Sequence, residues 1–249
     1  LEEIGDWLRN YGAAIYETRP SPFHCEMPWG SVTLKPGKMF LHIFEWKQGP
    51  FVLTGISNRV SKIYSLKDNE EITFVQKQDE TLDHYALIID LPARAPDDKV
   101  SVLTVEYEGV LKVDNTPVQQ PNGEVVLEAC FADIKKGREE SDIQLARTGV
   151  IEKWFDCEDS LTWDFKILKP GVYQVEMISL SEKYTKDWEC GHRFSLSVAN
   201  QNIEWTVEDH GRITPRGLIY WDNIHCSCGT IRIVKTGIYT LILKPQVLK

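Results

Sequence analysis

The sequence lacks the features that mark membrane-spanning, secreted-precursor or nucleic-acid-binding chains. No apolar run approaches the roughly 20 residues that a membrane-spanning helix needs, and the first residues lack a signal-peptide pattern. Lysine and arginine total 28 against 37 aspartate and glutamate residues, which gives a net charge of -9. Because phosphate binding needs clustered basic side chains, we expect neither nucleic acid nor an anionic membrane surface as a partner.

Motifs for metal binding and for common catalytic sites are missing as well. No Cys-x-x-Cys pair, His-Glu-x-x-His zinc motif, Gly-x-Ser-x-Gly elbow or glycine-rich phosphate loop occurs. His192, His210 and His225 are scattered, and isolated loop histidines are more often solvent-facing or locally hydrogen-bonded than bound to a metal. We therefore predict no metal site and no cofactor.

Cysteine is sparse, and its spacing leaves two interpretations open. The six cysteines are Cys25, Cys130, Cys157, Cys190, Cys226 and Cys228. Buried free thiols are the favoured interpretation. The alternative is one disulfide between Cys190 and either Cys226 or Cys228, which lie two residues apart and therefore share one side of a strand.

The chain does not begin with methionine, and its first nineteen residues predict a helix and its exit. Ile4, Trp7, Leu8 and Ile15 recur near one face at helical spacing, and Pro20 follows the helix. An isolated amphipathic helix must bury its apolar stripe against something. We therefore expect residues 1–20 to be the last helix of a missing preceding domain.

Short strands follow, separated by clusters of Gly, Pro, Asn and Asp. They are expected over residues 39–46, 51–56, 71–75, 85–91 and 100–107. The segment 109–123 contains Asn115, Pro117, Pro121 and Gly123, so it is interpreted as a linker. These signals predict one antiparallel domain over residues 21–112 and a second over residues 124–249.

The second domain shows clearer alternation. A first strand is expected over residues 125–132, and the apolar residues at 161, 163, 165 and 167 alternate with polar ones as in a half-buried strand. Pro170-Gly171 and Thr236-Gly237 mark turns before two further strands. The predicted fold class is mainly β: two antiparallel β-sandwich domains preceded by one remnant N-terminal helix.

Several short motifs in this order resemble the end of the catalytic domain and the following β-domain of α-L-fucosidases of glycoside hydrolase family 29. They are Leu1-Glu-Glu-Ile-Gly-Asp-Trp-Leu8, Ala14-Ile-Tyr-Glu-Thr-Arg-Pro20, Trp29-Gly30, Phe40-Leu-His-Ile-Phe-Glu-Trp46 and Leu53-Thr-Gly-Ile56. The resemblance covers roughly residues 1 to 107. It departs at Asn10-Tyr-Gly-Ala13, where the family more often has Asn-Gly-Glu. Residues 124–249 resemble only loosely the carbohydrate-binding-like sandwich modules appended to such enzymes.

The resemblance implies that the parent protein is a retaining glycoside hydrolase that removes terminal α-L-fucose from glycans. Its two catalytic carboxylates belong to the barrel, so we expect no catalytic residue in this chain. It also implies that the missing barrel is a partner and that the parent protein is exported to the periplasm or the cell exterior.

Aromatic residues in polar, loop-like contexts are the remaining candidates for function. Aromatic rings stack on the apolar faces of sugars, and Tyr184, Trp188, Trp221 and Trp154 are therefore predicted to bind carbohydrate, namely a fucosylated glycan. The alternative is a purely structural or protein-interaction module without sugar affinity.

Overall fold

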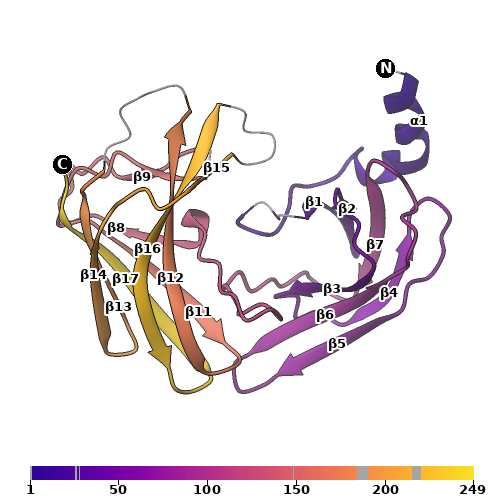
Figure 1. Cartoon of the computed structure of the whole chain (residues 1–249). Coiled ribbons are helices and arrows are strands. Elements are labelled where there is room, and N and C mark those ends of the chain that lie inside the picture. Colours follow the sequence, from indigo (N-terminus) through magenta and orange to yellow (C-terminus); the bar gives the residue numbers. More distant parts are fainter. Residues whose placement is uncertain (1, 26, 28, 148, 184–189, 215–219) are drawn as a thin grey trace. The chain divides into compact units, whose positions relative to one another are not determined.

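A computed structural model describes residues 2–25, 27, 29–147, 149–183, 190–214 and 220–249 (Figure 1). The chain divides into two compact units, Leu1–Asn115 and Thr116–Lys249. Both are built mainly from antiparallel strands. The two units are described separately below.

The first unit opens with helix α1 (Glu2–Tyr11) and a 3-10 turn, η1 (Gly12–Ala14). Tyr11 and Ala14 are completely buried against Phe40 and Val102. Trp7 adds a hydrogen bond in which its indole Nε1 donates to the Val100 carbonyl at 3.0 Å. The helix is therefore fastened to the sheet of the first unit at its C-terminal end. No described helix has the length and apolar character to cross a membrane.

The stripe expected to be buried on this segment is buried only in part. Ile4 is 60% exposed and Ile15 is 41% exposed, while Trp7 and Leu8 are half-buried and Trp7 packs against the first unit. The reason is that the packing contacts come from the last turn of α1, where Tyr11 points at the sheet. The helical period identified the element correctly but did not show which turn the sheet covers.

Two antiparallel sheets form a sandwich in the first unit (Figure 1). One has the order β1-β2-β7-β4 and consists of β1 (Gly30–Lys35), β2 (Lys38–Ile43), β7 (Ser101–Tyr107) and β4 (Val60–Ser65). The other has the order β3-β6-β5 and consists of β3 (Gly49–Thr54), β6 (His84–Leu91) and β5 (Phe74–Asp79). The strand expected over residues 71–75 begins later, because β5 starts at Phe74. Strands β1 and β4 were not predicted from the sequence.

The core of the first unit lies between these two sheets. It combines Met39, Leu41 and Ile43 from β2 with Leu87 and Ile89 from β6, all 0–1% exposed. The alternation of β2 is incomplete, because His42 on its other face is also buried, under α1 and η1.

The second unit is a sandwich of a five-stranded and a three-stranded sheet. The first has the order β14-β13-β17-β11-β8 and consists of β14 (Gln201–Thr206), β13 (Arg193–Val198), β17 (Gly237–Val247), β11 (Ser160–Ile167) and β8 (Asp133–Lys135). The second has the order β12-β16-β15 and consists of β12 (Gly171–Glu182), β16 (Trp221–Ile233) and β15 (Arg212–Ile213). A small ribbon pairs β9 (Gln144–Leu145) with β10 (Ile151–Glu152).

Two expectations about the second unit need correction. Residues 125–132 do not form a strand: the segment is extended loop and a 3-10 turn, η2 (Ala129–Phe131), and the first strand is β8. Strand β11 is not half-buried, because Thr162 and Lys166 on its polar side are only 7% and 3% exposed. The β8 strand and the segment around residue 118 pair with β11 along its outer edge, so β11 is not an edge strand.

The cysteines depart from both interpretations of the sequence. Cys25 and Cys130 are disulfide-bonded, so the expectation of free thiols throughout is wrong. Cys190 is free and exposed, and Cys226 and Cys228 are free and buried, which also excludes the alternative bridge in this structure. The placement of Cys226 and Cys228 on the same side of β16 is confirmed, with exposed Ser227 between them.

Candidate functional site

One candidate site lies at one end of the three-stranded sheet, where β12 ends and the central strand β16 begins. Trp221 is paired with Glu182 across these strands and is 36% exposed. At the same end of the sheet the Lys183 ammonium donates to Thr214 Oγ1 at 3.2 Å, and the Thr214 hydroxyl donates to Asp222 Oδ1 at 2.6 Å. Trp221 is exposed while its neighbour Asp222 is buried, so the indole and this chain of polar groups lie on opposite faces of β16. The feature of this site that suits a sugar is therefore the exposed indole alone. Tyr184 and Trp188, also predicted here, lie outside the described residues.

Trp154, the fourth predicted sugar contact, faces the core of the second unit. Its ring lies edge-on against Phe194, with a centroid distance of 5.3 Å, and Phe194 in turn stacks on Trp205 at 6.0 Å. The indole Nε1 of Trp154 is buried and has no hydrogen-bond partner among the described residues. Its role in sugar binding stays a prediction.

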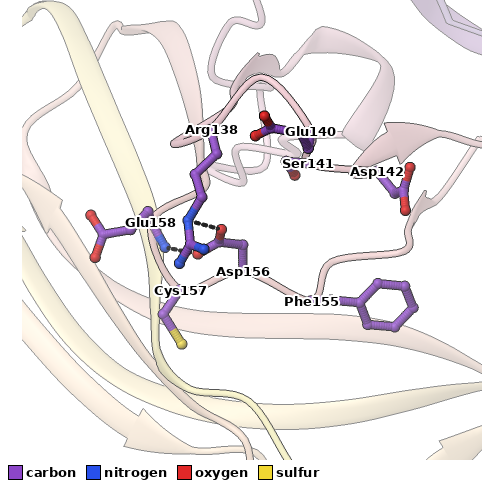
Figure 2. A pocket seen from close by; sticks show the side chains of 8 residues that line it. All are labelled: Arg138, Glu140, Ser141, Asp142, Phe155, Asp156, Cys157 and Glu158. Atoms are coloured by element: carbon purple, nitrogen blue, oxygen red, sulfur yellow. Dashed lines mark hydrogen bonds and ion pairs between the residues drawn. The ribbon is translucent and has the colours of Figure 1, made fainter.

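The residue after Trp154 has the opposite orientation. Phe155 is 78% exposed, one of the most exposed large apolar side chains of the described residues. It lines a cavity of about 530 Å³ formed by the segments 138–142 and 155–158 (Figure 2). In Figure 2, Phe155 and Asp142 lie at one end of this cavity, and Arg138, Asp156 and Glu158 lie at the other. We refer to it as the Phe155 cavity.

The polar wall of the Phe155 cavity is held in place by its own hydrogen bonds. Arg138 Nε contacts Asp156 Oδ2 at 2.9 Å, and the other Asp156 oxygen accepts from the Glu158 amide at 2.9 Å. Behind it, fully buried Asp159 accepts hydrogen bonds from the Gly137 amide and the Ser141 hydroxyl. The side chain of Asp159 thus links the two loop segments by hydrogen bonds in a water-excluded position, so the wall is preorganised.

Gly137 marks how closely the two segments approach each other. A Cβ atom at this position would lie 2.2 Å from Glu158 Cβ and 2.6 Å from its carbonyl carbon, so only glycine fits without movement of the backbone. The sequence pattern did not predict the Phe155 cavity. The only signals for it in the sequence were the acidic residues at 156, 158 and 159 and the phenylalanine that precedes them.

The three histidines have separate local partners. Nδ1 of His210 accepts from the Ser227 amide, and Nδ1 of His192 accepts from the Lys249 amide, both at 3.0 Å. His225 Nδ1 lies 3.0 Å from Glu176 Oε2. Within the described ranges, no group of three or more His, Cys, Asp or Glu side chains is arranged to hold a metal ion.

Comparisons with known proteins give structural matches only. No protein-family model and no curated protein matches this sequence. Among solved structures, α-L-fucosidase from Vibrio sp. strain EJY3 superposes with a TM-score of 0.74 at 23% identity and covers 99% of this chain and 40% of that chain. α-L-Fucosidase isoenzyme 1 from Paenibacillus thiaminolyticus (29% identity, TM-score 0.37) covers 43% of this chain and 25% of that chain. An α-L-fucosidase GH29 from Bacteroides thetaiotaomicron (23%, 0.35) covers 43% and 23%.

The Vibrio match extends over both units and shows a shared fold. The chain spans two-fifths of the length of that fucosidase. The other two matches have low TM-scores. In its architecture, this chain is therefore similar to part of an α-L-fucosidase structure.

Proposed function

We propose that this chain is the non-catalytic C-terminal region of an α-L-fucosidase and that its first unit supports the catalytic barrel. The observation that carries the proposal is the match of 99% of this chain to part of the Vibrio enzyme, at a TM-score of 0.74. The motifs of residues 1–56 point in the same direction. The parent enzyme hydrolyses terminal α-L-fucose from glycans, with both catalytic carboxylates on the barrel.

The exposed apolar side chains of α1 and of the residues directly after η1 are the surface that this proposal assigns to the barrel. Ile4 in α1 is 60% exposed, and Ile15 and Tyr16 after η1 are 41% and 59% exposed. Apolar groups gathered on a surface are typical of contact sites. A barrel packed here would bury them.

The test uses the product of the whole gene, including any sequence encoded ahead of Leu1. We expect a barrel in that sequence and release of 4-nitrophenol from 4-nitrophenyl α-L-fucoside, with no release by the 249-residue chain alone. Ile4→Glu is expected to lower the thermal stability of the whole product, whereas Asn10→Glu on the same helix leaves it unchanged, because Asn10 is exposed and polar already. Turnover by the 249-residue chain, or a whole product without a barrel, would overturn the proposal.

We further propose that the second unit contacts the glycan at the end of the three-stranded sheet that carries Trp221. The exposed indole of Trp221 supports this assignment, because aromatic rings stack on the apolar faces of sugars. Titration with fucosylated oligosaccharides, followed by tryptophan fluorescence, should give a change that Trp221→Ala abolishes. An unchanged spectrum at millimolar ligand would favour the alternative, a structural or protein-interaction module.

Export of the protein is a third part of the proposal. Disulfide-bonded Cys25 and Cys130 support it, since disulfides persist mainly in oxidising compartments. Cell fractionation of the native host is expected to find the protein outside the cytoplasm, with Cys25 and Cys130 oxidised. A cytoplasmic location would contradict it.

A further inference from the structure

We propose that the Phe155 cavity is a binding site for an uncharged sugar ring, separate from the sheet end that carries Trp221. The inference rests on the proposed function for the chemical class of its ligand, and on the geometry of the cavity for its place and its selectivity. Three features support it: an exposed aromatic ring, a preorganised polar wall and an excess of negative charge.

The aromatic ring is the first feature. Phe155 is 78% exposed while its neighbour Trp154 packs against Phe194, so the chain fixes Phe155 on the outer side by anchoring the residue before it. A sugar has one face of C–H groups and an edge of hydroxyls. Its C–H face contacts an exposed aromatic ring favourably, and this contact removes apolar surface from water on both partners.

The polar wall supplies groups that read hydroxyls. The Arg138 guanidinium is ion-paired with Asp156 through Nε, which leaves its terminal N–H groups to donate, and the side chain of Arg138 is 67% exposed. The carboxylates of Glu140 and Asp142 lie on the same lining and accept from hydroxyls. Donors and acceptors beside one aromatic ring match the mixed chemistry of a sugar better than that of a purely apolar ligand.

The charge of the lining decides between classes of sugar. Four carboxylates and one guanidinium line the cavity, so three negative charges are in formal excess. Lys244 offsets one of them in part, because its Nζ lies 3.6 Å from Glu158 Oε2 at the surface. Uronic acids and sulfated sugars would bring a further negative charge close to this lining. We therefore expect neutral sugars to bind and anionic sugars to be excluded.

The experiment is a titration of the ¹⁵N-labelled 249-residue chain with L-fucose, D-galactose and D-glucuronate, followed by amide chemical shifts. We expect L-fucose or D-galactose to shift resonances of residues 137–143 and 153–159 with a dissociation constant of about 1–10 mM, as is usual for a small ligand on an open surface. D-Glucuronate should bind at least about tenfold more weakly.

Matched variants test the role of the ring. Phe155→Ala should weaken the binding of the neutral sugar about tenfold and Phe155→Trp should retain it. Phe44→Ala is the control, because Phe44 is also exposed, at 57%, and belongs to the first unit. Both truncations remove exposed rings, so unfolding curves equal to those of the parent chain are expected and would establish that folding is intact.

The possible outcomes separate this inference from the proposed function. Shifts confined to residues near Trp221, removed by Trp221→Ala and not by Phe155→Ala, would overturn the proposal that the Phe155 cavity binds sugar. They would leave the sheet end at Trp221 as the sugar site. Equal binding of D-glucuronate would overturn the charge argument. No shift with any of the three sugars would overturn the proposal that the cavity binds sugar. Fucosidase activity of the whole gene product would still support the proposed parent enzyme.

Discussion

Truncation of Tyr11 tests whether α1 belongs to the fold of the first unit. Its side chain is completely buried against Phe40 and Val102, and its ring centroid lies 4.9 Å from that of Trp7. Replacing a buried aromatic ring by alanine costs about 3–5 kcal/mol through lost burial and the cavity left behind. We expect about 3 kcal/mol for Tyr11→Ala, the lower end, because no partner for the Tyr11 hydroxyl lies within the described ranges and its burial is itself unfavourable.

The assay is urea unfolding followed by fluorescence and circular dichroism, with Tyr16→Ala as the matched control. Tyr16 is 59% exposed, so its truncation should change the free energy of unfolding by less than about 0.5 kcal/mol. Tyr11→Phe should be neutral or stabilising, since it removes only the unpartnered hydroxyl. Equal and small effects of Tyr11→Ala and Tyr16→Ala would refute the packing of α1 on this sheet.

The pH dependence of stability provides a second test of the burial of the Tyr11 hydroxyl. Burial, with a contribution from Asp97 and Asp68, raises the pKa of Tyr11 to about 12. The unfolded chain ionises near pH 10, so the native state binds more protons between pH 10 and 12 and loses stability as the pH rises. This loss is about 2 kcal/mol by pH 12. Tyr11→Phe should remove it, and an unchanged alkaline stability profile in that variant would contradict the assignment.

Three further predictions concern buried groups elsewhere. Burial lowers the pKa of His42, so stability should fall as the pH drops below about 6.5, with a slope of at most about 1.4 kcal/mol per pH unit, and His42→Gln should flatten the acid limb of a urea-unfolding series. Gly55→Ala should destabilise the protein by more than about 1 kcal/mol in thermal unfolding, because φ is 89° and the new Cβ would meet the Asp114 carbonyl oxygen at 2.2 Å. Burial raises the pKa of the Cys228 thiol to about 12, so a thiol reagent should modify Cys190 in the native protein and Cys228 only after unfolding.

The sequence was most informative where turn chemistry and alternation agree. Strands β12 and β17 begin directly after the predicted turns at Pro170-Gly171 and Thr236-Gly237, and β13 and β14 follow the alternating residues. In each case the local preference, for a turn at glycine or for a strand with period-two alternation, agrees with the observed sheet. The fold class, two mainly antiparallel sandwiches after a helix, is confirmed.

Prediction was poorest where tertiary contacts decide. Residues 125–132 are rich in Val, Leu and Ala, yet they lie along the core without pairing in a ladder, and the Glu128 carbonyl instead accepts from the Trp163 indole at 2.9 Å. The long strand β16 was missed because its buried face begins with Asp222 and because Gly229 interrupts its alternation, and both residue types are depleted in strands. Local pattern does not contain this information.

The candidate site illustrates the same limit at the level of single residues. Trp154 and Phe155 are adjacent aromatics in one polar segment, and composition alone favours the larger ring as the sugar contact. In the structure Trp154 packs against Phe194 and Phe155 is exposed. Lys153, directly before them, has a φ of 56°, in the left-handed region, and buried Asp159 accepts a hydrogen bond from the Gly137 amide. An aromatic pattern reveals neither this backbone conformation nor the buried carboxylate, so it does not show which of the two rings faces solvent.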